Sequence, residues 1–384
     1  MVVLDGVGIG ALPDADRYGD AGSDTLGHVA GAAGPLALPV LESLGLGHLG
    51  ALAGVRALGS PRGARARLAE RSPGKDSTTG HWEMMGVVLE RPFPTYPHGF
   101  PPALLDRWSA RIGRGWLGNV AASGTEIIAR LGDEHLRSGR LIVYTSADSV
   151  FQVAAHEDVL PVEDLYAACR AARELLTGEH AVGRVIARPF AGAPGAFQRT
   201  PRRRDFSLAP PEPTVLDRLV AAGRRVMTVG KVDDLFAGRG VSDAVHTRSN
   251  AEGADVLLDL ARRPGEGLVF ANLVDFDTLY GHRNDPAGFA RALAQADAAI
   301  GALLGRLRGD EQAWITADHG NDPTTPSTDH SREYVPLLAG GPHVRAGADL
   351  GTRSTFADLG ATLAELFGVP APRHGASFLP ELRA

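Results

Sequence analysis

Short apolar runs alternate with amphipathic segments along most of the chain after residue 214. A run of a few apolar residues predicts a buried strand, and apolar positions spaced three and four apart predict a helix. Strands that alternate with helices form a largely parallel sheet covered by helices on both faces, so we expect an α/β fold. The expected helices are TVLDRLVAAG, ADVLLDLARR, residues 285–308 and TFADLGATLAELFG, and the expected strands are RRVMTVGKV, GLVFANLVDFD, QAWITADHG and YVPLLAGG.

The chain opens with an apolar run that is too short for a helix and is followed by Asp5 and several glycines. This pattern predicts a buried strand that ends at Asp5. Ligands of open α/β sheets bind at the carboxyl ends of the strands, so Asp5 is a candidate site residue, although an Asp at this point can also simply cap a turn. The GVGIG stretch lacks the spacing of a dinucleotide fingerprint.

Proline-rich segments interrupt the pattern twice. Five prolines lie between Arg91 and Pro102, and LAPPEP precedes the regular second half. The stretch between them contains the expected strands LIVYTSADS and VGRVIARPF and an amphipathic helix over 162–177. We therefore expect an inserted smaller α/β domain over 93–209, within a discontinuous core made of 1–92 and 210–384.

Composition narrows the class of partner. A net charge of -6 and a pI near 6.1 leave no overall footprint for nucleic acid or an anionic membrane, so chemistry on a small molecule is favoured. The single Cys169 excludes an intramolecular disulfide and lies on an apolar helical stripe, which indicates packing. No secretory leader and no membrane-spanning run is recognisable, so we expect a cytoplasmic protein. The sequence also shows no sign of an obligatory protein partner.

The stretch GKDSTTGHWEMMG, residues 74–86, has the pattern of a loop that leads into a helix. A hydroxyl at a helix start is either an ordinary N-cap or a nucleophile that faces an anion, because the unpaired N–H groups there attract negative charge. Only two of the 39 basic residues are Lys, namely Lys75 and Lys231. A Lys that persists where Arg fills nearly every other basic position indicates a need for a compact ammonium group.

Carboxylate and imidazole groups gather just after several expected strands. Asp mixed with neutral His suits Mn²⁺ or Zn²⁺, whereas Mg²⁺ and Ca²⁺ usually take oxygen ligands alone. Single pairs of this kind often cap helices, but several at strand ends predict a metal site with enough ligands for two ions. Two such ions suit the in-line transfer of a phosphoryl or sulfuryl group to or from an activated hydroxyl. The clusters are Asp5, DFDTLYGH (275–282), ADHGN (317–321) and TDH (328–330).

These motifs together resemble bacterial phosphopentomutases, members of the alkaline phosphatase superfamily. The resemblance implies an alkaline-phosphatase-like core with an inserted cap domain. It also implies the interconversion of ribose 1-phosphate and ribose 5-phosphate, and of the 2-deoxyribose forms, through a phosphorylated hydroxyl and a pentose bisphosphate. The motifs that carry it are LDGVGIG, SDTLGHVA, GKDSTTGHWEMMG, YTSADSVFQVAAHE, VDFDTLYGHRND, ADHGNDPTTPSTDHSREYVPLL and TFADLGATLAELFG.

The resemblance further implies a role for individual residues. The nucleophile would be Ser77, where the family has Thr, and the neighbouring Thr78 and Thr79 remain alternatives. Two Mn²⁺ ions per chain are implied, and a sugar bisphosphate activator would prime the phosphoenzyme. One ion would be held by Asp5, Asp318 and His319, and the other by Asp277, His282 and His330. The sugar would be bound by Ser146, Asp148, Val150, Arg184 and Ile186, with Lys231 and Lys75 as candidates to offset phosphate charge.

A related metal-dependent phosphatase, a phosphoglycerate-type mutase and a catalytically silent sugar-phosphate-binding protein are the alternatives. The motifs YTSADSVFQ and GKDSTTGHWE favour the pentomutase over the first two. An intact hydroxyl and a complete ligand set argue against the third. We expect His81, Trp82 and Glu83 to pack or hydrogen-bond around the loop rather than react.

Overall fold

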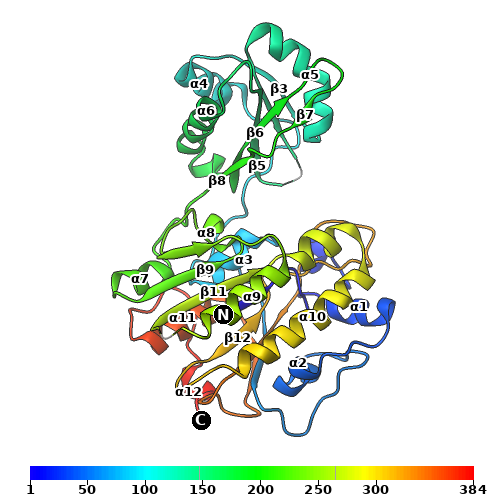
Figure 1. The fold of residues 1–384 in the computed structure, drawn as a ribbon, viewed down its shortest axis with the longest axis vertical. Coiled ribbons are helices and arrows are strands. Elements are labelled where there is room, and N and C mark those ends of the chain that lie inside the picture. Colours follow the sequence, from blue (N-terminus) through cyan, green and yellow to red (C-terminus); the bar gives the residue numbers. More distant parts are fainter. Residues whose placement is uncertain (147, 264) are drawn as a thin grey trace. The chain divides into compact units, whose positions relative to one another are not determined.

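Two proline-rich segments separate the chain into a core unit, Met1–Pro92 with Pro210–Ala384, and an insert unit, Phe93–Ala209 (Figure 1). The computed structural model describes residues 1–146, 148–263 and 265–384. Ala147, which falls within the expected strand LIVYTSADS, lies outside the described residues.

The core unit is built on an eight-stranded sheet with the order β10-β9-β11-β1-β12-β13-β2-β14. Neighbouring strands from β10 to β12 are parallel, and β13 runs antiparallel to both β12 and β2. The expected largely parallel sheet is therefore confirmed. The strands are β1 (Val2–Leu4), β2 (Ala64–Leu68), β9 (Arg225–Val229), β10 (Asp243–Val245), β11 (Gly267–Leu273), β12 (Ala313–Thr316), β13 (Val335–Gly340) and β14 (Asp349–Arg353).

Helices cover this sheet in two groups. In the first group, α1, α2 and α9 each contact the long α10. In the second group, α3 and α7 contact α11, and α8 contacts α3. Asp24 caps α1 by accepting a hydrogen bond from the Gly27 N–H. The helices are α1 (Thr25–Ala33), α2 (Pro39–Leu44), α3 (Ser77–Met84), α7 (Val215–Ala221), α8 (Val232–Leu235), α9 (Asn250–Leu260), α10 (Pro286–Leu304), α11 (Ala357–Phe367) and α12 (Leu379–Leu382), with single turns at η1 (Ala15–Tyr18), η2 (Leu46–His48), η4 (Phe276–Tyr280) and η5 (Gly281–Arg283).

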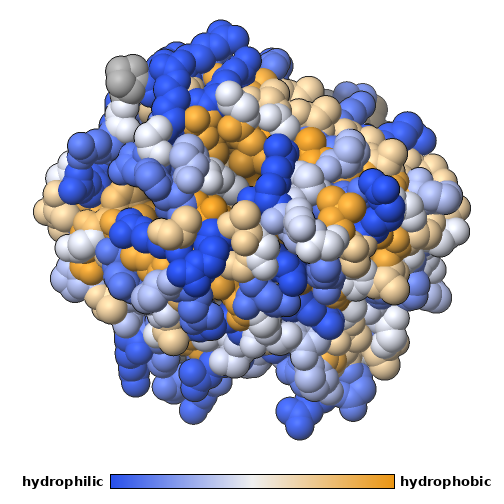
Figure 2. All heavy atoms as spheres, turned by 90° about the horizontal axis from the view of Figure 1, so that it is seen from below, coloured by the Kyte–Doolittle hydropathy of each residue, from blue (hydrophilic) through white to orange (hydrophobic). Residues whose placement is uncertain are grey.

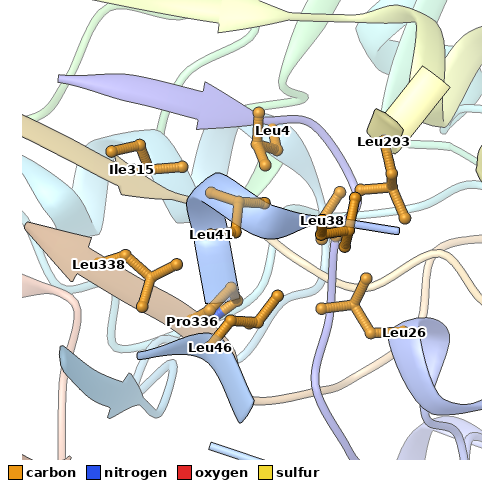
Figure 3. Close-up of a pocket in the computed structure, with 10 residues that line it drawn as sticks. Leu4, Leu26, Leu38, Leu41, Leu46, Leu293, Ile315, Pro336 and Leu338 are labelled. Carbon is orange, nitrogen blue, oxygen red and sulfur yellow. The ribbon is translucent and has the colours of Figure 1, made fainter. Parts of the chain in front are cut away.

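Aliphatic side chains from α1, α2 and α10 meet those of the sheet beside the first strand. Figure 3 shows Leu4 of β1 among Leu41, Leu293 and Leu338, around a cavity of about 10 Å³. Its wall is apolar, so the cavity is a packing gap rather than a place for a polar ligand. This packing fixes the strand whose next residue is Asp5.

The insert unit has its own sheet, with the order β3-β4-β5-β6-β7 and with β8 paired to β6. Helices α4 and α6 pack on one face, and α5 packs on the other. Cys169 of α6 is fully buried in the first of these clusters, which confirms its packing role. The elements are β3 (Trp116–Ala121), β4 (Leu141–Thr145), β5 (Val150–His156), β6 (Arg184–Ala191), β7 (Gln198–Arg199), β8 (Arg204–Ser207), α4 (Pro102–Ile112), α5 (Gly124–Ser138), α6 (Val162–Leu175) and η3 (Gly178–His180).

Strand β2 has no counterpart among the strands expected from sequence, because its sequence ARARL alternates Ala with Arg. The structure buries this strand all the same. Arg65 forms an ion pair with Asp349, and the Arg67 guanidinium lies over the ring of Tyr334, 4.3 Å from its centre. These partners compensate for the burial of Arg65 and the partial burial of Arg67.

The outer surface mixes side chains of both kinds. Figure 2 shows hydrophilic residues interspersed with hydrophobic ones over the face in view. Among the described residues, the exposed large hydrophobic side chains are Val220 and Leu279, at 39% and 51%. None of the described helices combines the length and the apolar character that a bilayer crossing requires.

Candidate active site

Three neighbouring strands of the core sheet bring the acidic clusters together. Strand β1 lies between β11 and β12 and is parallel to both, with Leu4 opposite Leu273 and Val3 opposite Thr316. Their carboxyl ends therefore meet at one edge of the sheet, where Asp5 follows β1 directly. The clusters that follow β11 and β12 begin at the same edge.

The first group of candidate ligands consists of Asp5, Asp318 and His319, all buried. One ligand atom from each lies within 4.8 Å of the others. The His319 Nε2 atom lies 3.4 Å from Asp5 Oδ1 and 3.4 Å from Asp318 Oδ2. The Nδ1–H of His319 donates to the Gly320 carbonyl at 3.0 Å, which orients the ring so that Nε2 faces the two carboxylates.

Buried carboxylate oxygens without hydrogen-bond partners make this group a candidate cation site. Both oxygens of Asp5 and Oδ2 of Asp318 lack such a partner. The Lys231 Nζ atom forms an ion pair with Asp5 Oδ2 at 2.6 Å, which leaves Oδ1 of Asp5 and Oδ2 of Asp318 to be compensated. Leaving buried carboxylate oxygens unsatisfied is costly, and a divalent cation between them would remove that cost. The donor set therefore fits a metal ion.

The second group consists of Asp277, His282 and His330. Asp277 sits in the π-helical turn η4, a backbone form that is frequent at functional sites. Its carboxylate lies 3.2 Å from His282 Nε2 and 3.3 Å from His330 Nε2. The Nδ1–H of His282 donates to the Thr328 carbonyl at 2.6 Å, so its Nε2 faces Asp277 in the way expected of a metal ligand.

The two groups adjoin each other and share one electrostatic environment. The ring centres of His319 and His330 are 3.9 Å apart. Burial alone would lower the pKa of His319, but the charge of Asp318 and contact with Asp5 raise it to about 10. The neighbouring carboxylates thus stabilise a positive charge at this place.

Ser77 is the first residue of α3 and lies beside the first group. Its Oγ atom is at hydrogen-bond distance from His319 Nε2, 3.2 Å, and accepts a hydrogen bond of 3.2 Å from Lys231 Nζ. The N-cap of α3 is Asp76, whose carboxylate accepts from the Thr79 N–H at 3.0 Å and from the Thr79 hydroxyl at 2.6 Å. The Thr79 hydroxyl is therefore engaged in capping, whereas Ser77 faces the candidate ligands.

Helix α3 approaches the first group closely because residue 80 is Gly. A Cβ atom at Gly80 would lie 2.2 Å from the carbonyl oxygen of Asp318, so a larger residue would push the helix away. His81 adds a second link, since its Nδ1 lies 2.8 Å from the Ser77 carbonyl oxygen and 3.3 Å from Asp318 Oδ2. The nucleophile candidate and the candidate ligand are thus held together by backbone packing and by a buried imidazole.

His81, Trp82 and Glu83 are buried and hydrogen-bonded, as expected from the sequence. Trp82 Nε1 donates to the Leu235 carbonyl at 2.8 Å, and the Glu83 carboxylate accepts from Ser72 and Thr355. These contacts fix both sides of α3.

The two lysines occupy different environments. Lys231 Nζ contacts Ser77 and Asp5, whereas Lys75 Nζ forms ion pairs with Asp20 and Asp329 at 3.1 and 3.2 Å. Of the two lysines proposed from sequence to offset phosphate charge, Lys231 is the one that the structure brings to the Ser77 hydroxyl.

A chain of supporting residues around the second group was not assigned from the sequence. Asn321 Nδ2 donates to Asp277 Oδ1 at 2.7 Å, and the Asn321 N–H donates to the Thr25 hydroxyl at 3.1 Å. Thr25 in turn donates to the buried Glu333 at 2.7 Å. The motif ADHGN contains Asn321, but only the fold reveals its link to Glu333, which is 12 residues further along.

Asp275, the first residue of the cluster DFDTLYGH, has a structural role and does not belong to either group of candidate ligands. Its carboxylate accepts from the Asn250 N–H at 2.8 Å, and its own N–H donates to the Asn250 side chain at 2.9 Å. This reciprocal pair fixes the start of α9.

The five residues expected to bind sugar all lie in the insert unit. Strands β5 and β6 are parallel and place Val150 opposite Arg184. Arg184 also forms a long ion pair of 3.9 Å with Asp148, and Ile186 follows on the same strand. Ser146 lies just after β4.

The comparisons with known proteins first define the class. The model of the metalloenzyme superfamily matches residues 1–371. Two solved structures, a protein from Pyrococcus horikoshii and the phosphoglycerate mutase of Leishmania mexicana, share the fold with TM-scores of 0.50 and 0.51 at 18% and 13% identity. Each alignment covers 98% of this chain, with 98% and 96% of the other chain, respectively. The fold is therefore the alkaline-phosphatase-like one expected from the sequence.

Closer relatives define the family. The phosphopentomutases of Herpetosiphon aurantiacus, Acetivibrio thermocellus and Anaeromyxobacter dehalogenans are 55%, 56% and 58% identical to this chain. The alignments cover 100%, 99% and 100% of this chain and 98%, 98% and 97% of those proteins. The chain belongs to the phosphopentomutase family and is an enzyme, a mutase of the isomerase class.

Proposed function

We propose that this enzyme interconverts ribose 1-phosphate and ribose 5-phosphate, and the 2-deoxyribose forms, through a phosphorylated Ser77 and a pentose bisphosphate. Family membership supports the substrate class. The observation that carries the proposal is the position of the Ser77 Oγ atom, 3.2 Å from both His319 Nε2 and Lys231 Nζ. A hydroxyl placed between a candidate metal ligand and an ammonium group suits a nucleophile in phosphoryl transfer.

Two Mn²⁺ ions would occupy the site. Mixed carboxylate and imidazole donors fit this metal, and the unpaired oxygens of Asp5 and Asp318 support a cation there. Bound ions would supply Lewis acidity for the transferred phosphoryl group. One would be held by Asp5, Asp318 and His319, and the other by Asp277, His282 and His330.

Ser77 exchanges its phosphoryl group with the sugar in both directions. In priming, the Ser77 Oγ–P bond forms as an O–P bond of a sugar bisphosphate activator breaks, and the serine proton ends on the released sugar hydroxyl. In turnover the phosphoserine passes its group to the free hydroxyl of the pentose monophosphate. The bisphosphate then reorients and returns its other phosphate to Ser77.

Lys231 offsets charge on the transferred group throughout this exchange. Burial acts to lower the pKa of Lys231, but the carboxylates of Asp5 and Asp277 raise it above its usual value. The ammonium group is therefore protonated at neutral pH and can donate to a phosphoryl oxygen at Ser77.

Five residues of the insert unit would bind the sugar. Paired strand positions and the Arg184 contact with Asp148 support a common binding surface there. The members of this surface are Ser146, Asp148, Val150, Arg184 and Ile186.

The cytoplasmic location of the protein stays a prediction from the sequence.

The test is an assay of ribose 5-phosphate formation from ribose 1-phosphate with Mn²⁺ present, with and without a sugar bisphosphate. We expect ribose 5-phosphate as the main product and faster turnover when the bisphosphate is added. Inorganic phosphate as the main product would instead identify a hydrolase.

A further inference from the structure

A fully buried hydroxyl in the insert unit has no hydrogen-bond partner. Tyr144 of β4 is 1% exposed, and its hydroxyl is unpaired within the described residues. Burying a phenolic O–H in this way costs free energy unless another group accepts a hydrogen bond from it. Burial raises the pKa of Tyr144, with nearby arginines opposing the rise, so the group is a donor at neutral pH.

The Tyr144 hydroxyl points at the N-terminus of a long helix. A Cβ atom at Gly124, the first residue of α5, would lie 2.7 Å from this hydroxyl and 3.6 Å from Arg199 Nη1. Gly124 therefore leaves room for both groups to approach the helix end. The N–H groups of Gly124 and Thr125 have no acceptor within the helix, and the helix dipole favours an anion at this end.

Two arginines without acidic partners share this face of the sheet. In the strand register, Tyr144 of β4 lies opposite Gln152 of β5, and Arg188 of β6 lies opposite Ala154 of β5. Gln152 and Ala154 are two residues apart on β5, so all of these side chains lie on the same face. The Arg188 Nε–H donates to Gln152 Oε1 at 3.1 Å. In the described part of the chain, neither Arg188 nor Arg199 forms an ion pair.

The two acidic side chains near these groups are paired with other arginines, since Glu126 in the first turn of α5 lies 4.0 Å from Arg130. Burial lowers the pKa of Arg188 and Asp205 of β8 opposes this shift, but the Asp205 carboxylate forms ion pairs with Arg203 at 2.6 Å and Arg184 at 3.6 Å. The surface around Tyr144 therefore keeps an excess of positive charge, which suits a doubly charged anion.

The same face carries the expected sugar contacts. Ile186 precedes Arg188 by two residues on β6, and Val150 precedes Gln152 by two residues on β5. Residues two apart on a strand share a face and lie about 6.6 Å apart. A pentose held at Val150 and Ile186 would therefore place a phosphate on its far side next to Arg188.

We propose that Tyr144, Arg188, Arg199 and the first N–H groups of α5 bind a phosphomonoester dianion, namely the phosphate of the pentose phosphate that is not being transferred. The nature of this ligand rests on the proposed function. A mutase that passes through a bisphosphate needs a place for the second phosphate, and retention of that phosphate keeps the intermediate bound while its sugar reorients.

The test compares the binding of ribose 5-phosphate and ribose by calorimetry, in the full chain carrying Ser77→Ala so that no turnover occurs. Tyr144→Phe and Arg199→Met are each expected to weaken ribose 5-phosphate binding about tenfold, because each loses a hydrogen bond to a charged group. Ribose binding should stay within about twofold in both. Arg130→Met is the matched control, because Arg130 is a half-exposed residue of α5 paired with Glu126, and it should change neither affinity.

Equal weakening of ribose and ribose 5-phosphate would show that these residues act on the sugar surface as a whole and would overturn the proposal. Unchanged ribose 5-phosphate affinity in both variants would overturn it as well. Neither result depends on catalysis, so a failure of the mutase assay alone would count against the proposed function and leave the phosphate subsite to be judged by binding.

Discussion

The ammonium group of Lys231 donates a hydrogen bond of 3.2 Å to the Oγ atom of Ser77. The same ammonium lies 2.6 Å from Asp5, so one cation bridges the proposed nucleophile and a proposed metal ligand. Few positions in the chain carry Lys at all, and an ammonium on a flexible stem can follow a phosphoryl group in a way that a guanidinium cannot. Lys231 is therefore the side chain that we expect to stabilise charge during transfer.

Replacing this lysine should reduce catalysis strongly. Lys231→Met is expected to lower kcat by about 10²-fold, the usual loss when one preorganised donor to a transferring group is removed. Manganese content should be unchanged. The control is Lys75→Met, since Lys75 is held by Asp20 and Asp329 and should cost less than about tenfold. An equal loss in both variants would contradict the assignment of Lys231.

Close packing at Gly80 predicts a second effect. Gly80→Ala places a methyl group 2.2 Å from the Asp318 carbonyl oxygen and should lower the free energy of unfolding in urea by about 1–3 kcal/mol. Gly31→Ala is the matched control, because Gly31 lies in helix α1 with open space at its Cβ position. It should raise stability by about 0.5–1 kcal/mol. Destabilisation of similar size in both variants would argue against a special contact at Gly80.

Metal counting tests whether the two ligand groups act separately. We expect elemental analysis to find two Mn²⁺ ions per chain in the wild type and fewer in Asp277→Asn, which removes a carboxylate from the second group only. Asp233→Asn is the control, because Asp233 belongs to a more exposed group with Asp234 and His246, and the count should not change. Loss of both ions in Asp277→Asn would show that the groups bind cooperatively as one centre.

Much of this arrangement could be predicted from the sequence. Asp5, Asp318 and His319 follow strongly apolar runs, and the carboxyl ends of parallel strands meet, so their meeting point follows from periodicity alone. The local sequence likewise predicts that a helix begins near Ser77. The structure shows that Asp76 is its N-cap.

Contacts between distant segments could not be predicted in this way. Nothing in the local sequence pairs Lys75 with Asp20 or places Glu333 behind Asn321, since these contacts depend on how loops fold back. Strand β2 cannot be predicted for a related reason, because its alternating arginines suggest an exposed segment until their partners are known.

The buried Glu333 predicts a pH dependence of stability. Burial raises the pKa of Glu333 to about 7 from its ordinary value of 4.5, although Ser331 and Thr25 oppose the rise. The folded state therefore holds this proton to higher pH than the unfolded state does. The resulting stability is full below pH 4.5 and is lost as the pH rises through about 7.

Glu333→Gln removes this titration while it keeps the shape of the side chain. Between pH 4.5 and about pH 8, the wild type should lose about 3 kcal/mol of unfolding free energy relative to the variant. The measurement is urea unfolding of both proteins with a chelator present, so that metal binding does not contribute. A difference in stability that stays constant with pH would contradict the raised pKa.

The most direct test of the central claim is to locate the phosphate. The protein is incubated with Mn²⁺ and a sugar bisphosphate, digested, and analysed by mass spectrometry, alongside a Ser77→Ala variant whose fold and metal content are checked. We predict phosphate on Ser77 in the wild type and neither phosphopeptide nor turnover in the variant. Phosphate on Thr78 or Thr79, or full mutase activity in Ser77→Ala, would contradict the account.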